Sequence, residues 1–173
     1  KVETIGDAYI AVAGCPKKCS GPEAAQRMAL FALDAMKIVK DYQTDDGANV
    51  CIRAGLASGP CVAGVIGTAL PKYTLFGDTV NFAARMEQTS QKMKIQISPS
   101  TQRMLLDAPA YDFECVERRD DSGELGVELK GKGRQYTYWV ESATKMSTSS
   151  KTDEIAAEKA KMVDILEQPE ENV

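Results

Sequence analysis

The order of helical and β-rich segments constrains the fold of this chain more than any other feature of its sequence. A Gly6-Asp7 turn joins two short β-rich runs, 1–5 and 8–13, and this pattern indicates a β-hairpin. Apolar residues at helical spacing then follow over residues 23–42. A hairpin before the first helix favours an α+β sandwich, with helices packed on a mostly antiparallel sheet.

The rest of the chain alternates between short strands and short helices. Asp78 is expected to cap a helix over 79–89, and Ser98-Pro99 starts another helix that ends near residue 106. Strands are expected at 50–57, 61–66, 73–76, 94–97, 111–116, 125–129 and 136–141. The apolar stripe of the first helix is expected to lie in the core, and its members are Met28, Phe31, Ala32, Ala35, Met36 and Val39.

Length and composition are those of one domain followed by a tail. The chain has 173 residues, and we expect a folded domain over 1–141. Residues 142–150 read as a Ser/Thr-rich linker, and 151–166 as a polar helix, so that 142–173 form a linker and tail. The net charge of −4 gives no indication of a nucleic-acid partner. A domain without excess positive charge needs local cations or metal ions to handle a polyanion.

The chain is interpreted as cytoplasmic, or as the cytosolic part of a membrane protein that is attached through other segments. No apolar run approaches the roughly 18 residues that a membrane span needs. The five cysteines have no regular spacing, which fits reduced thiols. Cys15 and Cys19 are poor candidates for a metal site, because the chain has no His and no second Cys pair nearby.

Four stretches together resemble the catalytic domain of the class III adenylate and guanylate cyclases. The run Phe76–Asn81, with Arg85 in place, makes the combination highly specific, and the order and spacing agree over about residues 1–141. The matching stretches are Lys1–Tyr9, Gly59–Gly67, Tyr73–Glu87, and Leu129–Gly133 followed by Tyr136–Trp139. The resemblance implies a ferredoxin-like sandwich and the conversion of GTP to cyclic GMP and pyrophosphate, with attack of the ribose 3′-oxygen on the α-phosphate.

The resemblance also implies cofactors and a missing part. Two divalent cations, Mg²⁺ or Mn²⁺, are expected to assist the attack. Asp7, at the tip of the hairpin, is implied as a metal ligand, although an Asp after Gly is also common in ordinary turns. In this family an earlier strand carries the first metal-binding Asp, and this chain is expected to begin after it. The isolated chain is therefore expected to have negligible activity.

Three further residues receive roles from the resemblance. Asn81 and Arg85 are spaced i, i+4 and share one helix face; Asn81 is implied to orient the ribose, and Arg85 to stabilise the transition state. Lys130 is implied to bind the phosphates. The structural alternatives are an ordinary polar helix face, with Arg85 paired to Glu87 or Asp78, and a solvated basic turn.

The choice of base depends on Glu3 and Thr74. A carboxylate can accept from both guanine donors, N1–H and N2–H₂, and a hydroxyl can donate to O6. Guanylate cyclases usually have Glu where Glu3 stands and adenylate cyclases usually have Lys. Guanylate cyclases usually have Cys where Thr74 stands, and some adenylate cyclases have Thr. Adenylate cyclase, with ATP as substrate, therefore remains the alternative.

The family resemblance implies that each site is built from two chains. Asp7 would come from one chain, whereas Glu3, Thr74, Asn81, Arg85 and Lys130 would come from the other. We expect a homodimer, or a heterodimer with another cyclase chain. A non-catalytic relative that only dimerises or binds nucleotide, and a generic ferredoxin-like binding module, are the alternatives outside catalysis; the joint presence of Asp7, Asn81 and Arg85 argues against both.

Overall fold

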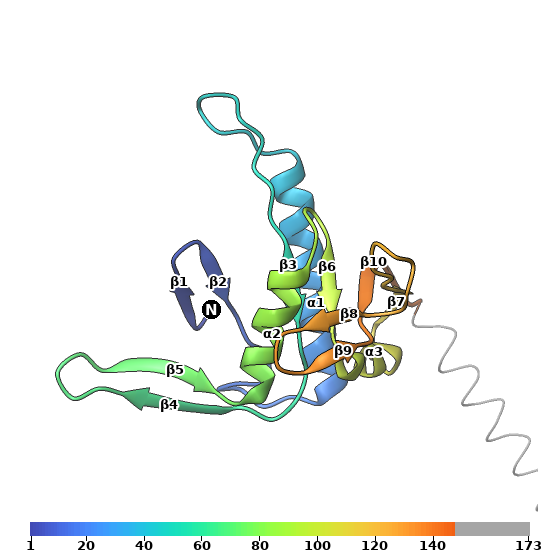
Figure 1. The fold of residues 1–173 in the computed structure, drawn as a ribbon. Helices are drawn as coiled ribbons and strands as arrows, with labels where there is room; N and C mark the ends of the chain where they lie inside the picture. Colours follow the sequence, from blue (N-terminus) through green and yellow to red (C-terminus); the bar gives the residue numbers. More distant parts are fainter. Residues whose placement is uncertain (148–173) are drawn as a thin grey trace, which may run out of the picture.

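A four-stranded sheet forms the centre of residues 1–147, the part of the chain that this computed structural model describes (Figure 1). Its strands lie in the order β3-β6-β10-β7, and their bounds are Ala54–Leu56 for β3, Ile95–Ile97 for β6, Tyr111–Glu117 for β7 and Tyr138–Lys145 for β10. Strand β10 is antiparallel to both of its neighbours, whereas β3 runs parallel to β6. The sheet is therefore mostly antiparallel, and the predicted α+β class is confirmed.

Helices cover both faces of this sheet, and their bounds are Gly21–Lys40 for α1, Asp78–Thr89 for α2 and Pro99–Leu106 for α3. Alternate residues of a strand point to opposite faces. Ile95 and Ile97 of β6 accordingly join the hydrophobic core together with residues of α1 and α3. Gln96, between them, meets Thr89 at the end of α2 instead. In Figure 1, α2 lies in front of the sheet and α1 lies behind it.

The first helix packs on the sheet through small residues. Its start is set by Ser20, whose hydroxyl accepts from the backbone N–H of Glu23 at 3.2 Å. Ala25, Ala29 and Ala32 are buried. The predicted core stripe is only partly right, because Phe31 is 48% exposed and packs against Tyr9 on the outer side, with ring centroids 6.0 Å apart. Three alanines form the contact surface, so large side chains are displaced to its edges.

The second helix approaches the sheet even more closely. Gly55 of β3 faces α2, and a Cβ at this position would lie 1.9 Å from the backbone nitrogen of Glu87. Only a glycine leaves room for the helix backbone at this distance. The closeness of this contact fixes α2, and any side chain that it carries, relative to the central sheet.

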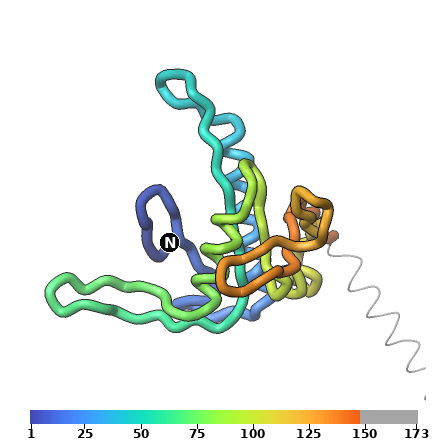
Figure 2. The backbone as a smooth tube through the Cα atoms, viewed as in Figure 1, coloured from blue at the N-terminus to red at the C-terminus, as the bar shows by residue number. Residues whose placement is uncertain are grey.

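Three two-stranded hairpins project from this core, and their strands are β1 (Glu3–Ile5) with β2 (Ala8–Ile10), β4 (Val62–Ile66) with β5 (Lys72–Phe76), and β8 (Val127–Leu129) with β9 (Gly133–Gln135). The tube in Figure 2 shows that β4–β5 extends far from the body and that β1–β2 stands apart from the central sheet. The β8–β9 hairpin instead lies close to α2 in Figure 1. The hairpins carry most of the residues that the sequence selects for function.

Several predicted boundaries change in the structure. The strand expected at 50–57 is confined to Ala54–Leu56. Asp78 is the first residue of α2 and not its cap; Gly77 holds the cap position, at a φ of 129° that only glycine adopts easily. The strand expected over 136–141 is shifted and runs over Tyr138–Lys145, and β9, at Gly133–Gln135, is a further strand that was not expected. The predicted C-terminal helix lies outside the described residues.

Within residues 1–147, no helix is long and apolar enough to cross a membrane. The five cysteines all lie in this part of the chain, and their thiols are free.

Candidate active site

The tip of the first hairpin carries Asp7. The register pairs Ile5 with Ala8, so that Gly6 and Asp7 form the two-residue turn predicted from the sequence. Asp7 is exposed at this tip. No group of three or more His, Cys, Asp or Glu side chains in residues 1–147 lies close enough together to hold a metal ion. Asp7 can therefore offer one carboxylate to a metal, and the other protein ligands would have to come from elsewhere.

A cation that the sequence analysis did not select lies near Asp7. Arg53, just before β3, donates to the Glu87 carboxylate of α2. Glu87 first, and Asp7 to a smaller extent, raise the pKa of the Arg53 guanidinium. The Arg53 charge is thus paired within the protein, as are the charges of Lys132 and Arg134. Nothing in the sequence near Arg53 indicates this, because Asp7 and Glu87 come from distant segments.

Glu3 and Thr74 come together as the sequence analysis expected. Thr74 of β5 donates its hydroxyl hydrogen to Glu3 Oε1 at 3.0 Å. Lys72 of β5 forms an ion pair with Glu3 Oε2. Lys72, followed by Thr74, lowers the pKa of the Glu3 carboxyl, so Glu3 is ionised at neutral pH. Two hairpins thus place a carboxylate, a hydroxyl and an ammonium group in one cluster.

Lys72 is a residue that sequence reasoning missed. Its signal is the spacing of two from Thr74 on the same strand, which places both side chains on one face of β5. The hydroxyl of Thr74 is also more restricted than expected. Because it donates to Glu3, its oxygen is left as an acceptor, and it must rotate away from Glu3 before it can donate to a base.

The helix α2 carries Asn81 and Arg85, with Asn81 exposed and Arg85 half-buried. The alternative in which Arg85 is neutralised by Glu87 or Asp78 is wrong, since Glu87 pairs with Arg53 and Asp78 pairs with Lys132. Arg85 Nη1 is buried and has no hydrogen-bond partner among the described residues. A buried guanidinium nitrogen without a partner is costly. This donor is therefore available for an anionic ligand.

The basic turn between β8 and β9 lies over Arg85. A Cβ placed on Gly131 would be 3.8 Å from Arg85 Nη1. Lys130 is exposed at the start of this turn, and no ion pair of residues 1–147 includes it. Lys132 and Arg134, in contrast, both have carboxylate partners. Of the three cations in this segment, Lys130 is the one whose charge is open to a ligand.

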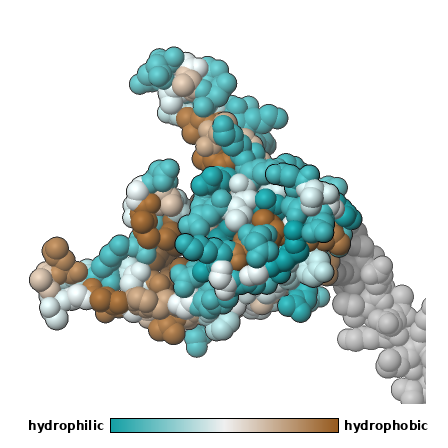
Figure 3. All heavy atoms as spheres, in the orientation of Figure 1, coloured by the Kyte–Doolittle hydropathy of each residue, from teal (hydrophilic) through white to brown (hydrophobic). Residues whose placement is uncertain are grey.

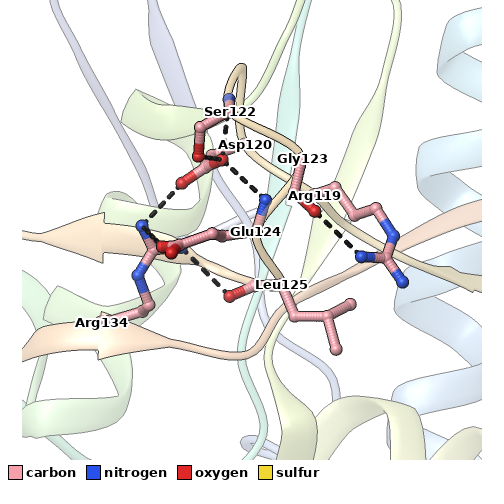
Figure 4. Close-up of polar contacts among 7 residues, drawn as sticks. All are labelled: Arg119, Asp120, Ser122, Gly123, Glu124, Leu125 and Arg134. Carbon is pink, nitrogen blue, oxygen red and sulfur yellow. Dashed lines mark hydrogen bonds and ion pairs between the residues drawn. The ribbon is translucent and has the colours of Figure 1, made fainter.

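The loop before β8 is joined to β9 through Arg134 (Figure 4). Asp120 accepts from the backbone N–H and hydroxyl of Ser122 and pairs with Arg134 at 2.6 Å. These two partners hold the pKa of Asp120 far below its usual range. Arg134 also pairs with Glu124 at 3.0 Å and donates to the carbonyl of Leu125. Arg134 therefore pairs with carboxylates of this loop, and these contacts hold the β8–β9 hairpin, which carries Lys130, against the loop.

The predicted site residues fall into separate groups. Glu3 meets Thr74, and Arg85 lies under the turn that starts at Lys130. Within the part of the chain that the structure describes, no hydrogen bond or ion pair joins Asp7 to Asn81, Arg85 or Lys130. A hollow between β2 and α1, lined by Tyr9, Met28 and Phe31 among others, contains none of the predicted substrate residues.

Comparison with known proteins gives the same family over almost the whole described chain. The description "Adenylate and Guanylate cyclase catalytic domain" matches residues 1–142. Mouse guanylate cyclase D is 44% identical over 142 residues, which are 81% of this chain and 12% of that protein. The chain thus spans about an eighth of the length of the curated relatives that it matches.

Solved structures of guanylate cyclase domains are also similar to this chain. The guanylate cyclase domain of RhGC from Catenaria anguillulae in complex with GTP has a TM-score of 0.70 and 43% identity, covering 83% of this chain and 72% of that one. A non-canonical dimeric guanylyl cyclase domain of the RhoGC fusion protein from Blastocladiella emersonii has a TM-score of 0.64 and 37% identity, covering 83% and 71%.

Proposed function

This chain belongs to the family of adenylate and guanylate cyclase catalytic domains, and from that premise we propose that it converts GTP to cyclic GMP and pyrophosphate. The observation that carries the choice of GTP is the Glu3 carboxylate, held between two hairpins by Lys72 and Thr74. An ionised carboxylate can accept from both guanine donors, N1–H and N2–H₂. Adenine presents an acceptor at N1 instead, and it would leave carboxylate lone pairs unpaired at a cost of roughly 1–3 kcal/mol.

The reaction forms a bond from the ribose 3′-oxygen to the α-phosphorus and breaks the bond from that phosphorus to the bridging oxygen of pyrophosphate. We assign Arg85 to the charge that develops on the α-phosphate, because its Nη1 donor is buried and unpartnered. Asn81, one helical turn earlier on α2, is assigned to orient the ribose. Lys130, free of any described ion pair, is assigned to the phosphates of the leaving group.

The assignment of a metal-binding role depends on the carboxylate of Asp7. Two divalent cations, Mg²⁺ or Mn²⁺, would activate the 3′-oxygen and neutralise the leaving group when bound. Asp7 fits this role because its carboxylate stands exposed at a hairpin tip.

We further propose that two chains share each site, with Asp7 from one chain and Glu3, Thr74, Asn81, Arg85 and Lys130 from the other. Two observations support this. No hydrogen bond or ion pair among the described residues joins Asp7 to Asn81, Arg85 or Lys130 within one chain, and the β4–β5 hairpin exposes large apolar side chains. Figure 3 shows apolar atoms gathered along this projecting hairpin. Its exposed apolar residues are Val62, Val65, Ile66, Leu70, Tyr73 and Phe76. Such a surface fits an interface with a second cyclase chain. Structures of the Blastocladiella relative are described as a non-canonical dimer and as a monomer.

Adenylate cyclase is the second candidate, and the hydroxyl of Thr74 is the observation that favours it. Because this hydroxyl donates to Glu3, its oxygen faces the site as an acceptor. An acceptor suits the N6 amino group of adenine and does not suit the O6 of guanine.

Product analysis decides between the candidates. The intact protein is incubated with GTP or with ATP and Mg²⁺, and the cyclic products are quantified. Our proposal requires a higher kcat/KM for GTP. A preference for ATP would transfer the assignment to adenylate cyclase, and no cyclic product from either nucleotide would support a non-catalytic member of the family.

The shared site is tested by mixing two inactive variants. Asp7→Ala and Arg85→Ala should each abolish activity in a homodimer, and a mixture should recover one intact site per heterodimer. An absence of recovery, with heterodimers demonstrated by tagged chains, would show that Asp7 and Arg85 do not act across an interface.

A further inference from the structure

Lys132 lies two residues from Lys130 in the same turn, yet its surroundings differ. Its Nζ is 2.7 Å from Asp78 Oδ2, at the first residue of α2. The same ammonium lies 5.5 Å from the ring centroid of Phe82, one turn further along that helix. Its side chain is 30% exposed, whereas that of Asp78 is 74% exposed. One lysine therefore attaches the turn to the start of the helix that carries Asn81 and Arg85.

The turn needs such an attachment because its backbone is permissive. Gly131 and Gly133 flank Lys132 and have φ values of 74° and 65°, in the left-handed region. Glycines lose much conformational freedom when they are fixed. The backbone bond from the Lys132 N–H to the Leu129 carbonyl, 2.9 Å long, closes the turn internally. It does not connect the turn to α2, and the Lys132 side chain does.

We propose that Lys132 is a positioning residue, which latches the phosphate-binding turn onto α2 through Asp78 and Phe82. The latch holds Gly131 over Arg85 Nη1, and it thereby keeps Lys130 and Arg85 on one side of the substrate. This inference rests on the proposed function, because it assigns Lys130 and Arg85 to the same triphosphate. The pairing of its ammonium with Asp78 distinguishes Lys132 from Lys130, which has no ion pair among the described residues.

The exposure of the Lys132–Asp78 ion pair indicates that it positions the turn and adds little to the stability of the fold. An ion pair this exposed contributes little to the free energy of unfolding. Cyclisation, in contrast, depends on geometry, and small displacements of a charged group are costly to the rate. Loss of the latch should accordingly reduce turnover while the protein remains folded.

A double-mutant cycle in the intact protein tests the latch. Lys132→Met removes the ammonium but keeps a side chain of similar length, and Asp78→Asn retains the helix start. We expect each change to lower kcat/KM for GTP about ten- to a hundredfold, through a lower kcat together with a higher KM. The melting temperature should fall by less than about 4 °C. Lys132→Arg should restore most of the activity, and Lys145→Met, on the far end of β10, is the matched control with wild-type kinetics.

The double variant gives the decisive comparison. If Lys132 acts through Asp78, the double variant should be no worse than the poorer single variant. If the losses multiply, Lys132 acts independently of Asp78, as a direct phosphate ligand would, and the proposal is wrong. It is also wrong if neither single change lowers kcat/KM.

Hydrogen exchange separates this inference from the proposed function. Amide exchange over residues 129–133 does not depend on catalysis, and we expect it to be faster in Lys132→Met and Asp78→Asn than in wild type and Lys145→Met. If the wild-type protein forms no cyclic nucleotide, the proposed function fails while the exchange data still report on the latch. Unchanged exchange in both variants would overturn the latch, whatever the activity.

Discussion

Two polar clusters of this protein contain the same kinds of side chain but differ in burial. In the first, Arg118 donates to Gln96 and to the carbonyl of Thr89, and Gln96 donates to Thr137. In the second, Lys72 and Thr74 bind Glu3. Gln96 is fully buried and Arg118 is 8% exposed, whereas the side chains of Lys72 and Glu3 are 60% and 12% exposed.

The buried cluster connects α2 to the sheet. Arg118 places its guanidinium at the C-terminal end of α2, whose last turn has no basic residue of its own. The guanidinium also stacks 4.8 Å from the ring centroid of Trp139. Burial lowers the pKa of Arg118, and nearby Asp121 and Asp120 partly oppose this. Arg118 Nη1, Gln96 and Thr137 bond within this cluster, whereas Arg118 Nε is buried without a hydrogen-bond partner among the described residues.

The exposed cluster retains free capacity. Each Glu3 oxygen has one partner from β5, and a carboxylate can accept about four hydrogen bonds in all. The comparison shows that burial decides the role of such a cluster. A buried cluster whose groups mostly bond one another stabilises the fold, whereas a cluster with accessible, free acceptors can recognise a ligand. Four changes test this distinction.

Arg118→Met should have the largest effect on stability. The change removes the Arg118 donor from the Thr89 carbonyl and from the Gln96 amide oxygen, which then keeps only the Thr89 hydroxyl as a donor. We expect a loss of about 2–4 kcal/mol in the free energy of unfolding. Urea denaturation measures it. Arg119→Met is the matched control, because Arg119 is exposed and donates only to Gly123, and it should change stability by less than about 0.5 kcal/mol. Equal losses in both variants would contradict the structural role of the buried cluster.

Adding Gln96→Leu to Arg118→Met tests whether the two side chains stabilise the fold together. Once the guanidinium is absent, the amide oxygen of Gln96 keeps only the 3.3 Å bond from the Thr89 hydroxyl, and replacing the amide with an apolar group removes the cost of this weakly satisfied acceptor. The double variant should be about 1–2 kcal/mol more stable than the sum of the single losses predicts. Strict additivity in the same denaturation assay would mean that the two side chains are not coupled.

Glu3→Lys should change recognition more than stability. Lysine replaces an acceptor with a donor that fits adenine N1, and the Thr74 oxygen can already accept from N6. We expect the ratio of kcat/KM for GTP to that for ATP to fall by at least about tenfold, or 1.4 kcal/mol. Kinetics with both nucleotides measure the ratio. An unchanged ratio would show that Glu3 does not read the base.

Lys72→Met should have the smallest effect. The ammonium group is the main cause of the lowered pKa of Glu3, so its loss should raise that pKa toward its ordinary value. A carboxyl with a lowered folded-state pKa adds stability above its unfolded pKa, and this contribution disappears as the pH falls through the folded value. Wild type should therefore lose slightly more stability than Lys72→Met between about pH 5 and pH 3. Carboxyl NMR of Glu3 and urea midpoints over this range measure both effects, and an unchanged pKa in the variant would contradict the assigned ion pair.

Much of the fold could be predicted because its signals are local. The Gly6-Asp7 turn, the cap of α3 by Ser98, whose hydroxyl accepts from Thr101 N–H at 3.2 Å, and the Asn81–Arg85 face each depend on residues a few positions apart. Phe31 shows where this approach fails. Helical spacing placed it in the core, but the alanines of α1 lie closest to the sheet and leave the ring at the edge.

The helical and β-rich segments, their order and the residue types suited to cyclase chemistry can be read from the amino-acid sequence. Only the tertiary structure decided how the charges are paired. Glu3 and Thr74 are 71 positions apart, and Lys132 and Asp78 are 54 apart. Contacts over such separations arise from the packing of whole helices and strands, such as the close packing of α2 against Gly55 of β3. That packing selects which lysine of the basic turn is paired and which is free, and it leaves one buried nitrogen of Arg85 without a partner.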